Sequence, residues 1–291
     1  MIYTIENDVL RVDIENIGAE LMSIYSKKTG TEYLWQGDKK YWGSRAPLLF
    51  PICGRLYKNE YTYKDKKYEM MLHGFARKMA FTVESHSKEE IVFCLTENEE
   101  SLKQYPFNFV FKVKYALEFN KLTNSLYVEN TDSKVMPFSI GYHPGFNVPF
   151  SDEDKYEDYY VEFDCAKEVE LLQWSNNLYS HSVPYKLESG KIIRLNHRIF
   201  DNEAIFLSNV CNKVALKNTK NNKSIKLIFD DITHLGFWKA QYTDAPYVCI
   251  EPWHGIPATD GVTDDLETKA EVIKLERGKS YNNSLVIEIN E

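Results

Sequence analysis

The sequence has few cysteines and no long hydrophobic run. Its five cysteines form no C-x-x-C pair and are odd in number: Cys53, Cys94, Cys165, Cys211 and Cys249. Several lie in apolar runs such as "IVFCL" and "YVCIE", so we expect all of them to be reduced core residues of an intracellular protein. No apolar stretch approaches the roughly 20 residues of a membrane-spanning helix. The early acids of "MIYTIENDVLRVDIEN" exclude a signal-peptide core there. Together these absences predict a cytoplasmic protein.

Basic residues are also in deficit. The 35 lysines and arginines face 43 acids, which gives a net charge of −8. This balance disfavours nucleic acid and anionic membrane surfaces as partners. Arginine is especially scarce, since only seven of the basic residues are arginine. Three of the seven, Arg45, Arg55 and Arg77, fall within one stretch of the chain.

Several catalytic signatures are missing. The chain contains no G-x-x-x-x-G-K-[ST] or G-x-G-x-x-G loop for phosphate, and no G-x-S-x-G nucleophile motif. His73, His143, His254 and Glu251 could in principle bind a metal, but no H-x-H or H-x-x-x-H spacing supports one. We therefore expect neither a cofactor nor a metal.

Alternation of apolar and polar residues dominates what is present. Hydrophobic residues make up 43% of the 291 residues, enough for a sizeable core. Hairpin patterns occur in five stretches: residues 3–16, 21–35, 60–70, 81–97 and 107–132. Helix signals are short and limited to residues 97–106 and 263–273. With no linker or repeat, the pattern predicts an all-β protein in which residues 1–291 form one large antiparallel β-sandwich domain.

The segment "SIGYHPGFN", residues 139–147, ends an apolar strand on a histidine. Pro144 disfavours a helical conformation at His143 and removes the next ladder donor. His143 is therefore predicted at a strand terminus with a fixed backbone. The alternative is a turn histidine that serves only its own loop.

A similar arrangement occurs in "APYVCIEPWHGIP". Residues 247–250 read as a buried strand, and Glu251 follows them directly before Pro252. Because of this proline, the strand should stop there or lie at a sheet edge. A buried carboxylate needs a partner or a raised pKa; the alternative to a functional role is pairing with a structural arginine. A His143 acid and a Glu251 base facing each other across a small polar ligand could exchange protons with it.

Other candidates surround these two. Arg55 follows the apolar "LLFPICG", and we favour a binding role for it. His73 in "MMLHGFAR" is more often a structural residue in such a setting, and Arg45 or Arg77 alone would suit ion pairs. The apolar faces on which a sugar ring could stack are offered by four aromatics, each of which could equally be core: Tyr142, Phe146, Trp238 and Trp253.

Four motifs in order, "GRL", "HGFAR", "GYHPGFN" and "CIEPWHG", resemble the aldose 1-epimerase (galactose mutarotase-like) family. The similarity extends over essentially the whole chain, and its nearest branch is the LacX-type bacterial members. It implies a β-supersandwich that interconverts the α and β anomers of aldoses without a cofactor. Glu251 then corresponds to the base that takes the C1 hydroxyl proton, and His143 to the acid that protonates the ring oxygen. Arg55 and His73 correspond to residues that bind the sugar, and Trp253 is a further candidate.

The sequence departs from this family at two places. Where the family carries an aspartate that holds sugar hydroxyls, "FDNEAIFLSN" places Glu203. The "HGFAR" motif is shared with relatives that act on hexose 6-phosphates, so Arg77 and Arg45 could meet a phosphate. The expected substrate is thus an aldohexose or its phosphate. A sugar-binding protein without catalysis is the alternative, and a glycoside hydrolase is disfavoured because Glu251 has no second carboxylic acid in a similar setting.

Overall fold

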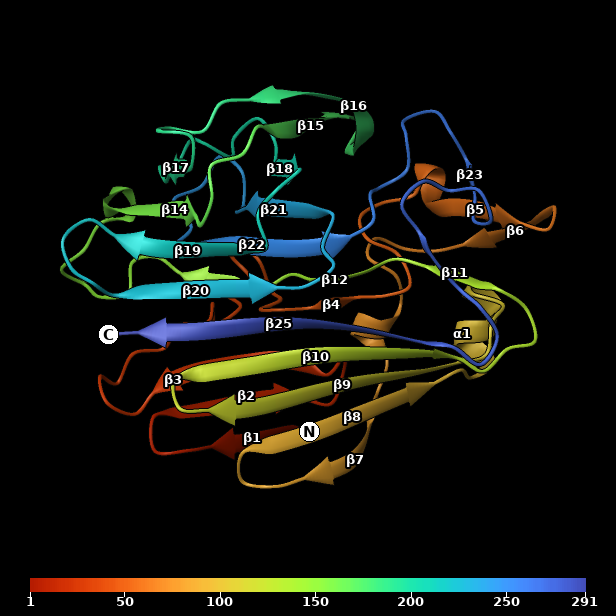
Figure 1. Cartoon of the computed structure of the whole chain (residues 1–291), viewed down its shortest axis with the longest axis horizontal. Helices are drawn as coiled ribbons and strands as arrows, with labels where there is room; N and C mark the ends of the chain where they lie inside the picture. The colour runs from red at the N-terminus through yellow and green to blue at the C-terminus, as the bar shows by residue number, and fades with distance from the viewer.

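Two large antiparallel sheets make up most of the molecule in the computed structural model, which describes residues 1–291 (Figure 1). The larger sheet has nine strands, in the order β17 (Ile192–Arg194), β14 (Tyr159–Phe163), β19 (Lys213–Asn218), β20 (Ser224–Phe229), β25 (Ser280–Asn290), β10 (Lys121–Asn130), β9 (Phe109–Glu118), β8 (Glu90–Thr96) and β7 (Thr82–His86). The second has eight, in the order β16 (Leu178–Tyr185), β15 (Val169–Ser175), β18 (Ile205–Ser208), β21 (His234–Trp238), β22 (Tyr247–His254), β12 (Ile140–Tyr142) and β4 (Leu48–Leu49), with β13 (Gly145–Asn147) also pairing with β22. The expected all-β fold is confirmed.

Smaller elements surround the two sheets. Three short sheets consist of β1 (Ile2–Glu6), β2 (Leu10–Glu15) and β3 (Glu20–Ser26); of β23 (Asp264–Asp265), β5 (Glu60–Tyr63) and β6 (Lys66–Glu69); and of β11 (Met136–Phe138) and β24 (Ile273–Leu275). The helices are α1 (Glu99–Gln104) and the 3₁₀ turns η1 (Tyr57–Asn59), η2 (Ala76–Lys78) and η3 (Tyr156–Asp158). None is long and apolar enough to cross a membrane.

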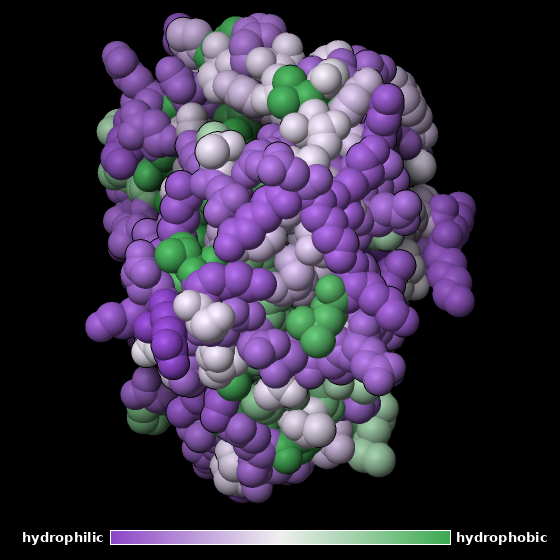
Figure 2. Space-filling model, turned by 90° about the vertical axis from the view of Figure 1, so that its right-hand side faces the viewer, coloured by the Kyte–Doolittle hydropathy of each residue, from purple (hydrophilic) through white to green (hydrophobic).

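The core follows from the period of two in the strands. In β9 and β10 every second side chain is buried, because alternate residues of a strand point to opposite faces of the sheet. The apolar side chains among them join one cluster of 70 buried residues, in which the Phe50 ring stacks on Phe111 at 4.7 Å between centroids. Burying each such side chain stabilises the fold by about 1.5–3 kcal/mol. The face at the right of Figure 1 is mainly hydrophilic, and its hydrophobic residues form small separate groups (Figure 2).

Most of the expected hairpins are present. β1–β2, β5–β6, β7–β8 and β9–β10 are all consecutive antiparallel pairs. Residues 21–35 form only part of a hairpin, since β3 is followed by a segment that pairs with it through one isolated bridge, Tyr25 with Glu32. The helix expected in residues 97–106 is α1, which Asn98 caps by accepting from the N–H groups of Glu100 and Ser101.

The helix expected in residues 263–273 is absent. This segment instead contains β23 and turns. Lys269 is buried there, and its Nζ donates to Asp264 at 2.7 Å and to the carbonyl of Pro257 at 3.2 Å. These tertiary contacts outweigh the weak helix propensity of the segment.

The expectation of five reduced cysteines is also wrong. Cys165 and Cys211 form a disulfide, while Cys53, Cys94 and Cys249 are free. β14 pairs with β19 so that Phe163 lies opposite Val214, and this places Cys165 beside Cys211 just beyond the paired residues. The cysteine content therefore gives less support to a reducing environment than the apolar runs suggested.

Candidate active site

The two proline-flanked residues meet because of strand register. β12 and β13 follow one edge of β22, with Gly141 opposite Trp253 and Gly145 opposite Cys249. Both pairings belong to the same antiparallel register, so His143, in the break between β12 and β13, lies opposite Glu251. Directly opposite residues project from the same face of a sheet and come into contact.

Glu251 does not end its strand. β22 continues through Pro252 to His254 and is paired on both sides, so neither expected alternative, a strand end or a sheet edge, is correct. The N–H of Ile250 donates to the carbonyl of Pro144 at 3.1 Å. Residues two apart in a strand direct their backbone nitrogens to the same side, so the nitrogen of Pro252 also faces the side on which β12 and β13 are interrupted. A strand tolerates proline where a ladder bond is already interrupted. Glu251 is therefore held in the middle of a regular strand.

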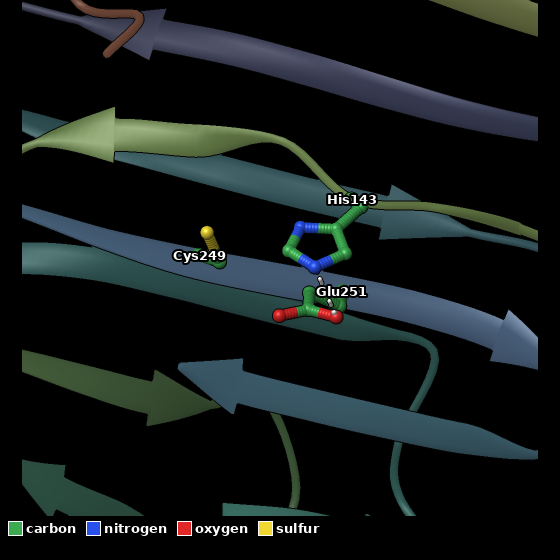
Figure 3. A group of neighbouring side chains, drawn as sticks. All are labelled: His143, Cys249 and Glu251. Atoms are coloured by element: carbon green, nitrogen blue, oxygen red, sulfur yellow. Dashed lines mark ion pairs between the residues drawn. The ribbon is translucent and has the colours of Figure 1, made fainter. Parts of the chain in front are cut away.

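A cavity of about 370 Å³ opens over this face of the sheet. All seven site residues expected from the sequence line it: Arg55, His73, Arg77, His143, Glu203, Glu251 and Trp253. At its floor, His143 Nε2 lies 3.2 Å from Glu251 Oε2, and the two side chains point at each other (Figure 3). The partner of Glu251 is thus a histidine and not a structural arginine.

Burial pushes both members of this pair toward their neutral forms. His143 is 8% exposed and Glu251 is 3% exposed. Desolvation lowers the pKa of His143 to about 3, with a small further contribution from Arg77. It raises the pKa of Glu251 well above its ordinary value. A neutral imidazole beside a carboxylic acid holds the same number of protons as an imidazolium beside a carboxylate, so one proton can move between the two side chains without exchange with solvent.

His73 is held in a single neutral tautomer. The N–H of Gly54 donates to His73 Nδ1 at 3.1 Å, so the ring proton lies on Nε2. Burial lowers the pKa of His73 well below its ordinary value, and the positive charges of Arg77 and Arg55 act in the same direction. Glycine at position 74 permits this packing, since a Cβ there would lie 2.2 Å from the carbonyl oxygen of Phe50. His73 thus combines a structural hydrogen bond with a place in the cavity wall, where it is a donor.

The arginines divide between two places. Arg55 and Arg77 line the cavity, and neither belongs to an ion pair. Burial lowers the pKa of Arg77, but a guanidinium keeps its charge in proteins. Arg45 lies elsewhere: its Nη1 donates to the carbonyl of Met22 and to Gln36 Oε1, both at 2.6 Å. The expectation that Arg45 could meet a phosphate in this site is therefore wrong.

The aromatic candidates also divide. Trp238 and Trp253 line the cavity, whereas Tyr142 and Phe146 are fully buried in the main core. Sequence reasoning missed three aromatic wall residues, Trp42, Trp174 and Phe206. Gly236 gives Phe206 its place, since a Cβ at Gly236 would lie 2.4 Å from that ring. Phe206 in β18 and Trp174 in β15 lie on the same face of two paired strands, the face that lines the cavity. This placement depends on the register between segments that are distant in the sequence.

The rim is formed by loops at the ends of strands. Glu203 precedes β18 and is half-buried, which raises its pKa. Asn177 occupies the tight turn between β15 and β16, where it and Asn176 adopt positive φ. Asp260 fixes this turn by accepting from Ser175 Oγ at 2.6 Å and from Asn176 Nδ2 at 2.9 Å.

One group of side chains has metal-ligand chemistry. Ligand atoms of His143, Cys249 and Glu251 all lie within 4.8 Å of one another (Figure 3). Burial raises the pKa of the Cys249 thiol well above its ordinary value, and the thiolate is the form that binds metals. Since His143 and Glu251 already contact each other, the residues suit a proton-sharing pair better than a metal centre.

The protein is thus an antiparallel β-sandwich with a cavity lined by polar and aromatic side chains, in which His143 contacts Glu251. The family model for aldose 1-epimerase matches residues 1–288. The plasmid and chromosomal forms of protein LacX from Lactococcus lactis subsp. lactis are 33% and 34% identical, over 94% of this chain and 95% of theirs. The chain therefore belongs to the aldose 1-epimerase family.

Solved structures agree with this assignment. A galactose mutarotase related enzyme from Lactobacillus acidophilus matches with a TM-score of 0.95 and 37% identity, over 100% of this chain and 98% of that one. A galactose mutarotase-like protein from Lactobacillus casei ATCC 334 matches with a TM-score of 0.94 and 31% identity, over the full length of both chains. The galactose mutarotase-like sandwich expected from the sequence is thus the fold of this chain.

Proposed function

We propose that the protein is a cofactor-independent aldose 1-epimerase that interconverts the α and β anomers of a hexose or a hexose phosphate. The observation that carries this proposal is the contact of 3.2 Å between His143 Nε2 and Glu251 Oε2 on the floor of the cavity. The cavity volume of about 370 Å³ suits a monosaccharide. Family membership supports an isomerase on this fold.

The reaction needs one proton removed and one delivered. In the proposed mechanism Glu251, as carboxylate, takes the proton of the C1 hydroxyl, and His143, as imidazolium, protonates the ring oxygen. The C1–O5 bond breaks and C1 becomes an aldehyde. Rotation about C1–C2 followed by the reverse transfers closes the ring on the other face. Each positioned proton transfer contributes about 10²–10⁴-fold to such a rate.

The number of protons that His143 and Glu251 hold together suits this scheme. In the empty cavity, desolvation favours neutral His143 and protonated Glu251. A sugar bound against the pair offers its C1 hydroxyl to Glu251 and its ring oxygen to His143. The reactive, charged arrangement then requires only a proton shift from Glu251 to His143.

Other wall residues have roles that follow from their chemistry. His73 presents its Nε2–H as a donor, Arg55 offers further donors, and Glu203 accepts from sugar hydroxyls at the rim. Trp253 and Trp238 offer apolar ring faces against which a pyranose can pack.

The test is magnetisation-transfer NMR on equilibrated glucose, galactose and glucose 6-phosphate, with and without the protein. Faster anomer exchange for any of them supports an epimerase and indicates its substrate class. Exchange accelerated only for glucose 6-phosphate would assign the unpaired Arg77 and Arg55 to phosphate binding. An unchanged exchange rate for all three sugars argues against the proposal.

A second candidate is a sugar-binding protein without catalysis. The neutral-pair arrangement that burial favours at His143 and Glu251 is the observation behind it. If binding does not shift the proton to His143, the sugar is held but not opened. Saturable sugar binding by calorimetry combined with unchanged anomer exchange would favour this candidate.

A further inference from the structure

An indole ring lies flat against the proposed acid. The rings of Trp42 and His143 are stacked, with 5.0 Å between centroids and 29° between planes. Trp42 belongs to the loop between β3 and β4 and lines the cavity. The proposed mechanism so far assigns no role to this residue.

Packing fixes Trp42 from several sides. Its backbone N–H donates to Asp38 O at 2.9 Å, and its carbonyl accepts from Trp35 Nε1 at 2.9 Å. The ring stacks on Tyr247 at 5.7 Å, and Trp238 meets it edge-on at 5.7 Å. This arrangement makes the stack on His143 a defined feature of the structure.

Gly145 in β13 leaves room for the Trp42 ring. A Cβ at Gly145 would lie 3.0 Å from Trp42 Cζ3 and 3.2 Å from Trp35 Cβ. An alanine there would therefore have to shift Trp42 by a few tenths of an ångström. Gly145 also follows His143 by only two residues, so the strand that carries the acid also makes room for the indole.

Apart from Glu251 and the backbone of His143 itself, the groups around the ring do not stabilise its positive charge. Arg77 carries a positive charge, which disfavours an imidazolium. His73 stays neutral and meets the ring edge-on at 5.4 Å, and Trp238 presents its ring edge-on at 6.1 Å. Cys249 is a buried, protonated thiol. The face of an indole attracts a cation at this distance through its quadrupole, and tryptophan does so best among the aromatic residues.

We propose that Trp42 is a positioning residue for His143: its indole holds the imidazole in the plane that faces Glu251 and stabilises the protonated ring. The catalytic meaning of this contact rests on the proposed function. The contact itself can be measured without any substrate.

The experiment replaces the five tryptophans of the chain by tryptophans carrying increasing numbers of fluorine atoms. Fluorine withdraws electron density from the ring face while leaving ring size nearly unchanged, so it weakens the cation–π attraction. The ¹⁵N shifts of the His143 imidazole, assigned by loss of the signal in His143→Gln, are followed as the pH is lowered from 7 and report the pH at which the ring takes up its proton. We expect this midpoint to fall with each added fluorine, and kcat to fall by about 2- to 30-fold across the series.

Three variants isolate the contribution of Trp42. In Trp42→Phe, the ¹⁵N shifts of His143 and kcat should no longer depend on fluorination. Trp174→Phe changes a cavity residue that does not stack on His143, and there the dependence should remain. Gly145→Ala should shift the unchanged indole by a few tenths of an ångström and lower the pH at which His143 takes up its proton, by less than Trp42→Phe does.

Two outcomes would overturn the proposal. One is ¹⁵N shifts of His143 that do not respond to fluorination. The other is a response confined to KM, which would mean that Trp42 only contacts the sugar. Responsive ¹⁵N shifts in a protein that accelerates no anomer exchange would support the contact with Trp42 and would instead count against the epimerase proposal.

Discussion

At the scale of single residues, the site is governed by desolvation. His143 and Glu251 are both buried, and each alone would be costly to charge. Placed opposite each other, they are close enough for one proton to pass between them. In the proposed mechanism this burial serves the reaction, and it should also reduce the stability of the fold; the two effects can be measured separately.

Replacing Glu251 by Gln tests the base. The amide keeps the shape of the side chain but accepts no proton from the C1 hydroxyl, so we expect kcat for anomer exchange to fall by about 10²-fold or more. Magnetisation-transfer NMR provides the rate, and circular dichroism shows whether the fold is intact. Glu203→Gln at the rim is the matched control and should alter KM more than kcat. A Glu251→Gln protein with a near-normal rate would remove Glu251 from the mechanism.

The buried histidine predicts a loss of stability in acid. The pKa of His143 is lowered from its ordinary 6.5 to about 3, so the unfolded chain binds a proton at a pH where the folded chain does not. The His143 contribution to stability therefore falls as the pH drops from about 6.5 toward 3, by up to about 1.4 kcal/mol per pH unit. The raised pKa of Glu251 acts in the opposite sense, because the folded chain keeps a proton there that the unfolded chain loses, so the effect of His143 is measured by comparison with a variant. Urea unfolding at pH 7 and pH 5 should show a smaller loss in His143→Gln than in the wild type.

His181 provides the control for this measurement. It is exposed, and His181→Gln should lose as much stability between pH 7 and pH 5 as the wild type. Equal losses in all three proteins would show that His143 is charged in the folded state at pH 5, contrary to the effect of its burial.

At the scale of elements, the local hairpins were predictable and the longer-range placements were not. Alternation of apolar and polar residues marks β9 and β10, whose register is set by the turn that joins them. His143 and Glu251 could be selected because a proline follows each of them. Their direct opposition could not, since it depends on the register between β12 and β22, more than a hundred residues apart in the chain.

The residues that sequence reasoning missed share this cause. Trp42 lies in a loop without a periodic pattern, and only tertiary packing brings it to His143. Glu251 was expected to end its strand because proline usually does so, and the interruption of the neighbouring strand at Pro144 could not be read from the sequence. In each case a local rule was overridden by a partner from a distant segment.

The turn between β15 and β16 makes a prediction about binding. Asp260 holds this turn through Ser175 and Asn176, and the turn carries the cavity residues Trp174 and Asn177. In Asp260→Ala we expect the rim to loosen and KM to rise several-fold, with kcat little changed because His143 and Glu251 lie on the floor. Saturation kinetics of anomer exchange separate the two parameters. A fall in kcat at constant KM would show that this turn acts on the chemistry itself.

At the scale of the whole molecule, the disulfide that should stabilise the fold and the cavity that should bind the substrate lie in different parts of the structure. The disulfide lies beyond the paired ends of β14 and β19 in the nine-stranded sheet, and neither Cys165 nor Cys211 lines the cavity. It closes a loop with a sequence separation of 46, which restricts the unfolded chain far more than the folded one. Its contribution should therefore appear in the free energy of unfolding and not in the proton transfers.

Removing this link gives the corresponding prediction. Reduction, or the double change Cys165→Ser with Cys211→Ser, should lower the free energy of unfolding by about 2–5 kcal/mol. The exchange rate per folded molecule should stay unchanged, because His143 and Glu251 are positioned by the register of β12, β13 and β22. Urea unfolding with and without reductant measures the first quantity, and the double variant should no longer respond to reductant. A wild-type unfolding midpoint that is indifferent to reductant, together with five titratable thiols in denaturant, would mean that the two cysteines are not linked. A lower exchange rate with stability unchanged would mean instead that the β14–β19 end of the large sheet is coupled to the cavity. The connection would be β18, which ends shortly before Cys211 and carries Phe206 in the cavity wall.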